Sequence, residues 1–226
     1  MKKVAILQSN YIPWKGYFDL IRRVDEFILY DEMQYTKNDW RNRNLIKTPR
    51  GTLWLTIPVV QNCLHQKISE TKIADPRWAK KHMGSLQMNY ARAPHFPAYA
   101  SRIFETYSEV EHEPFLSRVN FAFIRSICNW LGIRTKITWA SDYELADGKT
   151  ERLVDLCRQT GATDYISGPA AKNYLKMELF ERADIRVHWM DYSNYAEYAQ
   201  LFPPFVHGVS ILDLIFNVGE RAAQFF

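Results

Sequence analysis

The sequence predicts an α/β fold in which a mostly parallel central sheet is flanked by helices. Six short apolar segments have the composition of strands, helical patterns lie between most of them, and no repeat, low-complexity tract or Gly/Ser linker interrupts the chain. Alternating strands and helices are typical of a parallel sheet, because each parallel pair needs a crossover connection. An α+β protein with antiparallel strands is the alternative, and the pattern leaves the strand order open.

The predicted strands fall into two groups, one in the first quarter of the chain and one after its middle. They are residues 3–8, 26–31 and 53–59, then 135–140, 164–168 and 186–191. Each contains Val, Ile, Phe, Tyr or Trp, the residue types that are enriched in strands. Strands buried on both faces are nearly continuous in apolar residues, so these segments suit the interior of a parallel sheet.

Helical patterns account for much of the remaining chain. They are residues 18–23, 76–90, 96–107, 114–131, 151–160 and 211–216. The clearest is 114–131, where apolar residues recur at helical spacing on one face. It begins at Pro114, which suits a first helical turn, and stops at Gly132. Before the last helix, Ser210 and Asp213 resemble a capping box.

Composition predicts both the domain organisation and the cellular location of the protein. The chain of 226 residues is 47% hydrophobic and 24% charged, so we predict a single globular domain, 1–226, with a helical insertion at about 76–131. No segment approaches the roughly 20 apolar residues of a membrane span, and no signal peptide is evident. Three scattered cysteines fit a reducing compartment, and we expect a cytoplasmic location.

The composition and the spacing of its residues also exclude several classes of site. Nine glycines are present, and none are spaced for a dinucleotide-binding fingerprint or an NTPase phosphate loop. The formal charge of +4 is too small to predict nucleic-acid binding, and the histidines and cysteines lack metal-ligand spacing. We therefore predict no cofactor, no metal, no nucleic acid and no membrane span, with a small molecule as the substrate.

Polar residues follow the predicted strands at the points where the strands end. Gln8 ends the first strand, Asp31 the second and Gly168 the fifth. Ligands of open parallel sheets bind in the crevice beyond the carboxyl ends of the strands, so we expect these residues on one edge of one sheet. Loops are polar in any protein, and that plainer interpretation stays open.

The segment after the first strand carries amide, phenol, indole and ammonium groups within one short turn. Its candidate substrate-binding residues are Gln8, Tyr11, Trp14 and Tyr17. Tyr and Trp rings stack on a planar or sugar ligand while their polar tips form hydrogen bonds, and Gly16 permits a close approach of the backbone. The alternative is an aromatic plug that covers the end of the sheet.

A second concentration of polar groups lies at 31–44, where charges alternate in sign without an amphipathic stripe. Its candidate substrate-binding residues are Gln34, Lys37, Trp40, Asn42, Arg43 and Asn44. Lys37 and Arg43 converge on a phosphate only if the segment is an irregular loop, with Arg supplying a bidentate fork and Lys a mobile charge. A solvated loop held by salt bridges explains the charges nearly as well.

These two segments carry a resemblance to a known family. They read Gln8-x-x-Tyr11-x-Pro13-Trp14-x-Gly16-Tyr17-Phe18 and Asp31-x-x-Gln34-Tyr35-x-Lys37-x-x-Trp40-x-Asn42-Arg43-Asn44. Later pieces follow in the matching order, namely 55–58, Trp78 to His82, Tyr90 to Pro94, Tyr165 to Gly168 with Tyr174, and 210–214. The whole chain thus resembles the WbqC-like protein family. Many members have His at the position of Gln8, and Gln cannot act as a general base.

The resemblance implies a role in surface polysaccharide biosynthesis. Such proteins occur with genes for lipopolysaccharide O-antigen, and transfer of glycine or another acyl group to an amino sugar is suggested for them. We therefore predict an acyl or aminoacyl transferase acting on a phosphorylated substrate such as a nucleotide sugar, with an acyl donor or carrier protein as a further partner. The alternatives are a nucleotide-dependent nucleotidyltransferase or ligase, and a non-catalytic protein that recognises a carrier protein or a polysaccharide enzyme.

Two residues are candidates for the acid–base chemistry. Acyl transfer to an amine needs a base for the ammonium proton. His82 is the first choice, because imidazole titrates near neutrality and the preceding lysines favour its neutral form; an exposed helical histidine is the alternative. Asp31 is the best carboxylate, at a strand end that meets the crevice. Gly168 and Tyr174 complete the predicted substrate-binding residues.

Overall fold

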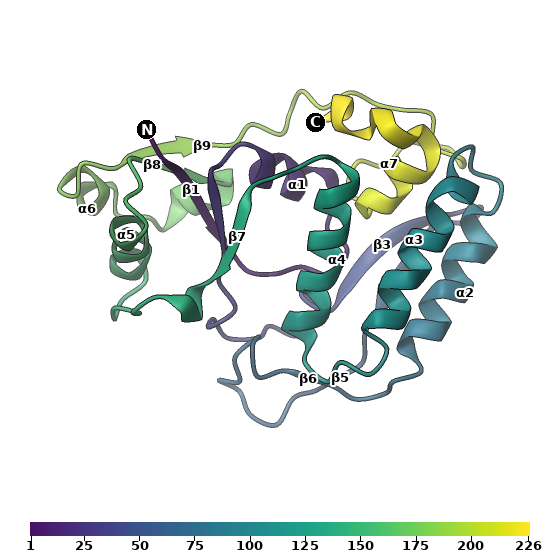
Figure 1. Cartoon of the computed structure of the whole chain (residues 1–226), viewed down its shortest axis with the longest axis horizontal. Coiled ribbons are helices and arrows are strands. Elements are labelled where there is room, and N and C mark those ends of the chain that lie inside the picture. The colour runs from purple at the N-terminus through teal and green to yellow at the C-terminus, as the bar shows by residue number, and fades with distance from the viewer. The chain divides into compact units, whose positions relative to one another are not determined.

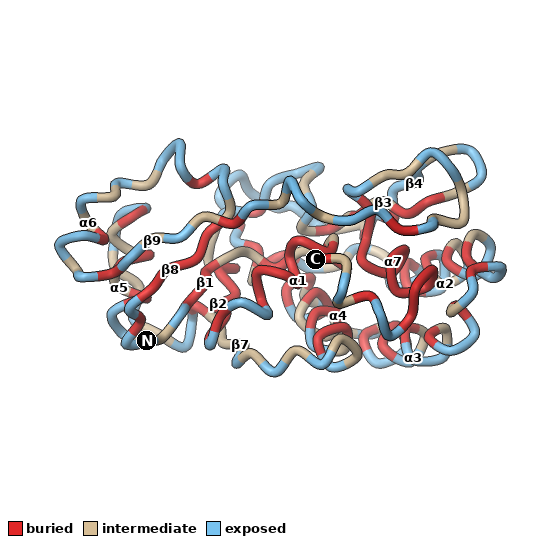
Figure 2. The backbone as a smooth tube through the Cα atoms, turned by 90° about the horizontal axis from the view of Figure 1, so that it is seen from above, coloured by how far each residue is buried: buried red, intermediate tan, exposed pale blue.

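The computed structural model describes residues 1–226 and divides them into two compact units. The first, called the sheet unit, comprises Met1–Gln8, Gly16–Met33 and Ile133–Asn194. The second, called the helical unit, comprises Ser9–Lys15, Gln34–Gly132 and Tyr195–Phe226. Figure 1 labels the elements along the chain, and Figure 2 shows which stretches are buried. Neither unit is a continuous segment, and the single domain stays a prediction that the cooperativity of unfolding tests.

The sheet unit contains a five-stranded parallel sheet, which confirms the α/β class. Its order is β7-β2-β1-β8-β9, with bounds Lys136–Trp139, Glu26–Leu29, Lys3–Leu7, Asp164–Ser167 and Arg186–Trp189. Every neighbouring pair is parallel, and all five strands were expected from the sequence. The chain builds β2 and β7 on one side of β1 and then β8 and β9 on the other. The strand order therefore reverses between β1 and β8.

Helices pack on this sheet and connect its strands. They are α1 (Lys15–Arg22) between β1 and β2, α5 (Thr150–Gln159) between β7 and β8, and α6 (Met177–Glu181) between β8 and β9. Side chains of α5 and α6 share one buried cluster with those of β1, β2 and β8. Within it, Tyr165 stacks on Phe180 with ring centroids 5.1 Å apart. All four residues of β2 are buried, as expected for an interior parallel strand.

The third predicted strand lies outside this sheet. Residues 53–59 overlap β4 (Gly51–Thr56), which pairs antiparallel with β3 (Arg43–Thr48) in a separate two-stranded sheet of the helical unit. A tight turn decides this pairing, because Gly51 has φ +113°, a conformation that favours glycine. Arg43 and Asn44 therefore begin a strand, whereas residues 37–42 before them form the irregular connection that the phosphate hypothesis requires.

Three helices occupy the predicted insertion. They are α2 (Trp78–Tyr90), α3 (Phe96–Glu109) and α4 (Leu116–Trp130), and they confirm the helical block expected at 76–131. α4 begins after Phe115, so Pro114 lies before the helix and not in its first turn. The Pro114 carbonyl instead accepts a hydrogen bond from the Ile73 N–H at 2.8 Å. Gly132 follows α4 with φ +68°, in agreement with the predicted stop.

The last helix, α7 (Ile211–Val218), is buried along its whole length. Ser210 caps it by accepting a hydrogen bond from the Leu212 N–H at 3.3 Å. The predicted capping box is only half formed. The Ser210 N–H donates to the Leu45 carbonyl and not to the side chain of Asp213. The remaining elements are β5 (Val59–Val60), β6 (Lys72–Ile73) and the 3₁₀ helices Ala140–Asp142, Pro169–Asn173 and Gly219–Phe225.

A buried carboxylate in the sheet unit, that of Glu26, is held by four side chains. It accepts hydrogen bonds from Lys2 at 2.7 Å, from Lys136 and Thr138 at 3.1 Å, and from Tyr143. Burial opposes its ionisation, but these hydrogen bonds lower the pKa of Glu26 to about 2.

The helical unit holds a comparable buried carboxylate, that of Asp213 on α7. It accepts hydrogen bonds from the Tyr90 and Tyr198 hydroxyls, both at 2.7 Å. The Tyr90 hydroxyl in turn accepts the Lys47 N–H at 2.9 Å, which ties β3 to α2. Burial raises the pKa of Asp213 above its ordinary value, because no cation contacts it closely enough to outweigh desolvation.

Three further observations concern the helices, the possible metal ligands and the buried cysteines of the chain. None of its helices combines the length and the apolar composition needed to cross a membrane. No three His, Cys, Asp or Glu side chains are grouped so as to hold a metal ion. Burial raises the pKa of the Cys128 and Cys157 thiols to about 12, so neither supplies a thiolate at neutral pH.

Candidate functional site

The carboxyl ends of β1, β2 and β8 open onto a pocket of about 630 Å³, which we call the sheet-edge pocket. It is lined by Ile6, Leu7, Gln8, Tyr30, Met33, Gly148, Lys149, Arg152, Leu153, Tyr165, Ser167 and Tyr174, all of the sheet unit. The pocket includes residues of β1 and β8, between which the strand order reverses. Open α/β sheets bind their ligands at such switch points.

The predicted edge position of three polar residues is confirmed. Gln8 follows β1, Asp31 follows β2 and Gly168 follows β8, and these three strands are parallel neighbours. Of the three, Gln8 lines the pocket itself. Asp31 is buried, and it comes directly after the lining residue Tyr30.

Two cations line the sheet-edge pocket at the start of α5. The Arg152 guanidinium donates its Nε–H to the Ala146 carbonyl at 2.7 Å and also forms a hydrogen bond with Tyr30. These two contacts fix the direction of the Arg152 fork. Lys149 is exposed, so its ammonium group keeps its conformational freedom. The pair combines a rigid fork with a mobile point charge, an arrangement suited to a phosphate.

The first turn of α5 already holds one anion, the Glu151 carboxylate. It accepts hydrogen bonds from the backbone N–H groups of Thr150 and Glu151, and these lower the pKa of Glu151. Its other contact is an ion pair with Lys176 at 2.9 Å. The helix terminus thus favours negative charge, as its dipole predicts. A ligand phosphate meets the side chains of Lys149 and Arg152 first, because the amide groups are occupied.

Three tyrosines give the sheet-edge pocket its aromatic surface. Burial raises the pKa of Tyr30, Tyr165 and Tyr174, so all three hydroxyls are protonated at neutral pH. Tyr165 is fixed by its stack on Phe180 and lies 3.4 Å from the Ser167 Oγ. Tyr174 is 60% exposed, so its ring is accessible to a ligand.

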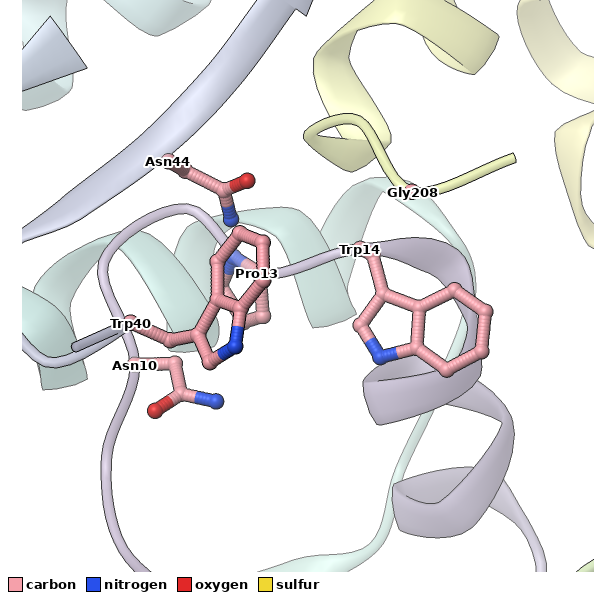
Figure 3. Close-up of a pocket in the computed structure, with 6 residues that line it drawn as sticks. All are labelled: Asn10, Pro13, Trp14, Trp40, Asn44 and Gly208. Carbon is pink, nitrogen blue, oxygen red and sulfur yellow. The ribbon is translucent and has the colours of Figure 1, made fainter. Parts of the chain in front are cut away.

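A second pocket, of about 330 Å³, lies wholly in the helical unit and is called the indole pocket (Figure 3). Its lining consists of Asn10, Pro13, Trp14, Trp40, Asn44 and Gly208. Trp14, Trp40 and Asn44 are predicted substrate-binding residues, and the structure brings them to one cavity. None of the lining residues carries a charge.

The backbone of the first loop is strained where it enters the indole pocket. Ile12 has φ +34°, an unfavourable region for a β-branched residue. The Asn44 amide donates to both carbonyls on either side of this bend, that of Tyr11 at 3.1 Å and that of Ile12 at 2.9 Å. Strained residues persist only where their surroundings hold them, and Asn44 supplies that restraint.

Arg43, the predicted phosphate ligand, has its guanidinium directed at its own segment. Its carbon Cζ lies 4.1 Å from the ring centroid of Trp54, which in turn lies 5.3 Å from Trp40. Its Nη2 donates to the Asn38 carbonyl. Arg43 therefore supports the wall of the indole pocket, and the phosphate clamp with the exposed Lys37 stays a prediction.

Lys15 anchors the segment that supplies Gly208. It is buried, its Nζ donates to the Ala196 carbonyl at 2.9 Å, and it lies 5.1 Å and 6.0 Å from the ring centroids of Tyr195 and Phe205. Burial lowers the pKa of Lys15 to about 8. This cation–π contact ties the first loop to the chain around residue 208.

His82, the predicted base, lies in a buried hydrogen-bond chain. Its Nε2 lies 3.2 Å from the Thr56 carbonyl, which can only accept, so Nε2 carries the proton. Nδ1 then accepts from the Tyr11 hydroxyl at 2.8 Å, and Tyr11 accepts from Tyr107 at 2.5 Å. Burial lowers the pKa of His82 to about 4, so it is neutral, but neither ring nitrogen has a lone pair left for a substrate. This geometry favours a structural role for His82 over its predicted role as the catalytic base.

The remaining predicted residues have local partners. Asn42 donates to the Ile57 carbonyl at 2.8 Å, Gln34 donates to the Leu64 carbonyl at 2.6 Å, and the Tyr17 hydroxyl donates to the Gln8 carbonyl at 3.0 Å. Tyr11 is fully buried, so it belongs to the core and not to a pocket wall. Its ring packs against Trp78 and Phe123 of the same unit.

The most informative site residues were missed in the sequence. Tyr30, Lys149 and Arg152 line the sheet-edge pocket, and Asn10 and Gly208 line the indole pocket. One weak signal existed, the tripeptide Gly-Lys-Thr at 148–150, which also ends the phosphate loop of many NTPases. The first glycine of that loop is absent here, so the motif by itself carried no prediction.

Comparison with known proteins identifies relatives of the whole chain. The model of the WbqC-like protein family matches residues 8–225. An uncharacterized protein of Mycobacterium tuberculosis is 54% identical over 226 residues, an alignment that covers 100% of this chain and 97% of the relative. No solved structure matches the chain.

Proposed function

The chain belongs to the WbqC-like protein family, and from that premise we propose that it is a transferase that binds a nucleotide or nucleotide sugar through its phosphates in the sheet-edge pocket. One observation carries the proposal. Two cations and three tyrosines line a single pocket at the switch point of a parallel sheet. The ends of β2 and β8 and the start of α5 bring these groups together, and ligands of α/β folds bind at this position.

The lining suggests a division of roles. Arg152, held by Ala146 and Tyr30, offers a fixed fork to one phosphate, and Lys149 offers a mobile charge to the same or the next one. The Tyr174 ring is exposed enough to stack on a base or a sugar. The protonated tyrosine hydroxyls donate hydrogen bonds to ligand oxygens.

We further propose that the transferred group is an acyl group, such as glycyl, and that the acceptor is an amino sugar of a surface-polysaccharide precursor. The sugar amine attacks the acyl carbonyl carbon, the new C–N bond forms, the leaving group of the donor departs, and a base removes the ammonium proton. Asp31 is our candidate for that base, because its carboxylate follows Tyr30 at the end of β2. The acyl group and the polysaccharide pathway enter the proposal from the family resemblance.

Ligand titration tests the phosphate site. The full chain is titrated calorimetrically with UDP, ADP, UDP-N-acetylglucosamine and inorganic phosphate, and its midpoint of thermal unfolding is measured with each. We expect a nucleotide to bind and to raise the midpoint, because a ligand of the native state stabilises it. Lys149→Gln and Arg152→Gln should each weaken binding at least about tenfold, since a hydrogen bond to a charged group contributes about 1.5–3 kcal/mol.

Arg158→Gln is the matched control. It removes the same charge from the exposed last turn of the same helix, away from the pocket, so it should bind like the parent. Equal losses in all three variants, or no binding of any of these probes, contradict the proposed site. Mass analysis of an amino sugar nucleotide incubated with acyl donors then separates a transferase from a non-catalytic binding protein.

A further inference from the structure

The indole pocket has a lining that the proposed function does not use. Its walls are two indoles, a proline ring, two amides and the backbone of Gly208, with no charged side chain among them. A phosphate or a carboxylate therefore finds no counter-charge there. The lining suits a neutral ligand with an apolar face and a few hydrogen-bonding groups.

Each indole of the pocket has an aromatic neighbour. Trp40 contacts Trp54 with centroids 5.3 Å apart, and Trp14 contacts Tyr195 at 5.9 Å. Trp40 nevertheless stays 42% exposed, a large value for an aromatic residue whose ring is held in place by a neighbour. Each indole is thus a platform held in place by a ring neighbour, and Trp40 keeps exposed surface for a ligand.

The Asn10 amide adds a directed donor. Arg41 donates to the Asn10 Oδ1, so the orientation of the amide is fixed and the Nδ2 group is the part left to a ligand. In Figure 3 this nitrogen lies on the side of the amide nearer to Trp14, and the oxygen points away. Two platforms and an amide donor therefore border the same space.

We propose that the indole pocket binds the ring of a neutral pyranose sugar. A pyranose presents an apolar face of C–H groups, which packs on an indole, and a rim of hydroxyls, which accept hydrogen bonds from an amide such as Asn10. A nucleobase also stacks on an indole, and nucleosides are therefore the competing class in the test. The pocket, at about 330 Å³, lies at the small end of ligand sites, which suits a monosaccharide.

Several contacts hold the walls of the indole pocket in place. Asn44 restrains the strained bend at Ile12, Arg43 fixes Trp54 behind Trp40, and Lys15 ties down the segment that ends at Gly208. A loop that served only as a connection needs none of these restraints. Strain of this kind collects at ligand sites.

Saturation-transfer NMR of the full chain tests the inference. The probes are methyl α-glucoside, methyl α-galactoside and N-acetylglucosamine, with uridine and adenosine as the competing class. We expect at least one sugar to bind and to show its strongest transfer at ring C–H protons of one face. Trp40→Ala and Trp14→Ala should each weaken that sugar about tenfold.

Two further variants keep the test decisive. Gly208→Val adds bulk where an added Cβ meets no atom within 4 Å, so it should block the sugar without disturbing the fold. Trp130→Ala removes a half-buried tryptophan of the same unit that does not line the pocket, and it should bind like the parent. Binding of nucleosides without sugars, or sugar binding that survives both Trp40→Ala and Gly208→Val, overturns the proposal.

This inference does not rest on the phosphate site. All its residues belong to the helical unit, and the probe sugars carry no phosphate. Loss of nucleotide binding in Lys149→Gln with sugar binding intact therefore concerns the sheet-edge pocket alone, and the reverse result concerns the indole pocket alone.

Discussion

The two pockets of this protein are built in opposite ways. The sheet-edge pocket takes part of its wall from strand ends whose positions are set by backbone hydrogen bonds of a parallel sheet, and the start of α5 adds Lys149 and Arg152. The indole pocket takes its walls from loops and from Asn44 of β3, and its lining residues carry no charge. Charge separates the classes of ligand, since phosphates need cations and neutral sugars do not.

The difference also shows what each kind of scaffold requires. The backbone hydrogen bonds of a parallel sheet fix the strand ends that form part of the sheet-edge pocket. The loops of the indole pocket have no such ladder, so side chains hold its wall in place: Asn44 in the lining, and Arg43 and Lys15 behind it. Mutations behind the lining should therefore affect the indole pocket more than the sheet-edge pocket.

The largest expected effect concerns the buried carboxylates of the two units. Asp213→Ala leaves the buried Tyr90 and Tyr198 hydroxyls without an acceptor, at about 1–3 kcal/mol each, so we expect a loss of about 3 kcal/mol in the free energy of unfolding. Glu26→Ala should cost less, because the side chains of Lys2 and Lys136 are 36% and 66% exposed and reach water. Urea denaturation measures both. An equal or larger cost for Glu26→Ala contradicts the comparison.

The next effect separates the pockets by charge. The double variant Lys149→Gln/Arg152→Gln should weaken nucleotide binding about 100-fold, which corresponds to about 2.7 kcal/mol. It should leave the binding of a neutral sugar unchanged. Raised salt should weaken the nucleotide and not the sugar, because screening acts on charge pairs only. Titration of both probes at two salt concentrations decides, and a shared response means that the two pockets are not independent.

Acid should loosen the helical unit before the sheet unit. Burial lowers the pKa of His82 to about 4, so the unfolded chain binds its proton more readily and stability falls as pH drops from 6.5 towards 4. That linkage amounts to about 2 kcal/mol between pH 7 and pH 5. Glu26, with a pKa of about 2, contributes stability that is lost only as pH falls from about 4.5 towards 2.

Hydrogen exchange followed by mass spectrometry across this pH range measures the two units separately. Peptides of α2 and α3 should lose protection first, and peptides of β1 and β2 later. His82→Gln should flatten the response of the helical unit between pH 7 and pH 5. Loss of protection at one common pH, unaffected by that variant, contradicts the assignment.

The smallest expected effect is a gain. Glu151→Gln removes the carboxylate that occupies the first turn of α5 and frees Lys176 from its ion pair. Nucleotide binding should therefore tighten about two- to threefold, because the phosphate no longer competes with a carboxylate for the positive end of the helix. Glu178→Gln, an exposed glutamate on α6, is the control and should not change the affinity. Weaker binding in Glu151→Gln means that the carboxylate positions the site instead of competing for it.

Local pattern by itself determined much of this protein. Five of the strands, the helical block and the stop at Gly132 follow from apolar periodicity and glycine, which act over a few residues. The common edge of Gln8, Asp31 and Gly168 followed from one added rule, that successive strands separated by helices are parallel. Trp14, Trp40 and Asn44 were found because unusual side chains crowd a short connection.

Only the tertiary structure decided the rest, because the decisive contacts join residues far apart in the chain. The start of α5 reaches the ends of β1 and β2 across more than one hundred residues, and Tyr90 meets Asp213 across 123. Tertiary contacts likewise place the segment 53–59 in a hairpin instead of the central sheet, and they bury His82 against Tyr11. The role of a side chain depends on its burial and on its interaction partners. When distant segments supply both, the local sequence pattern cannot predict that role.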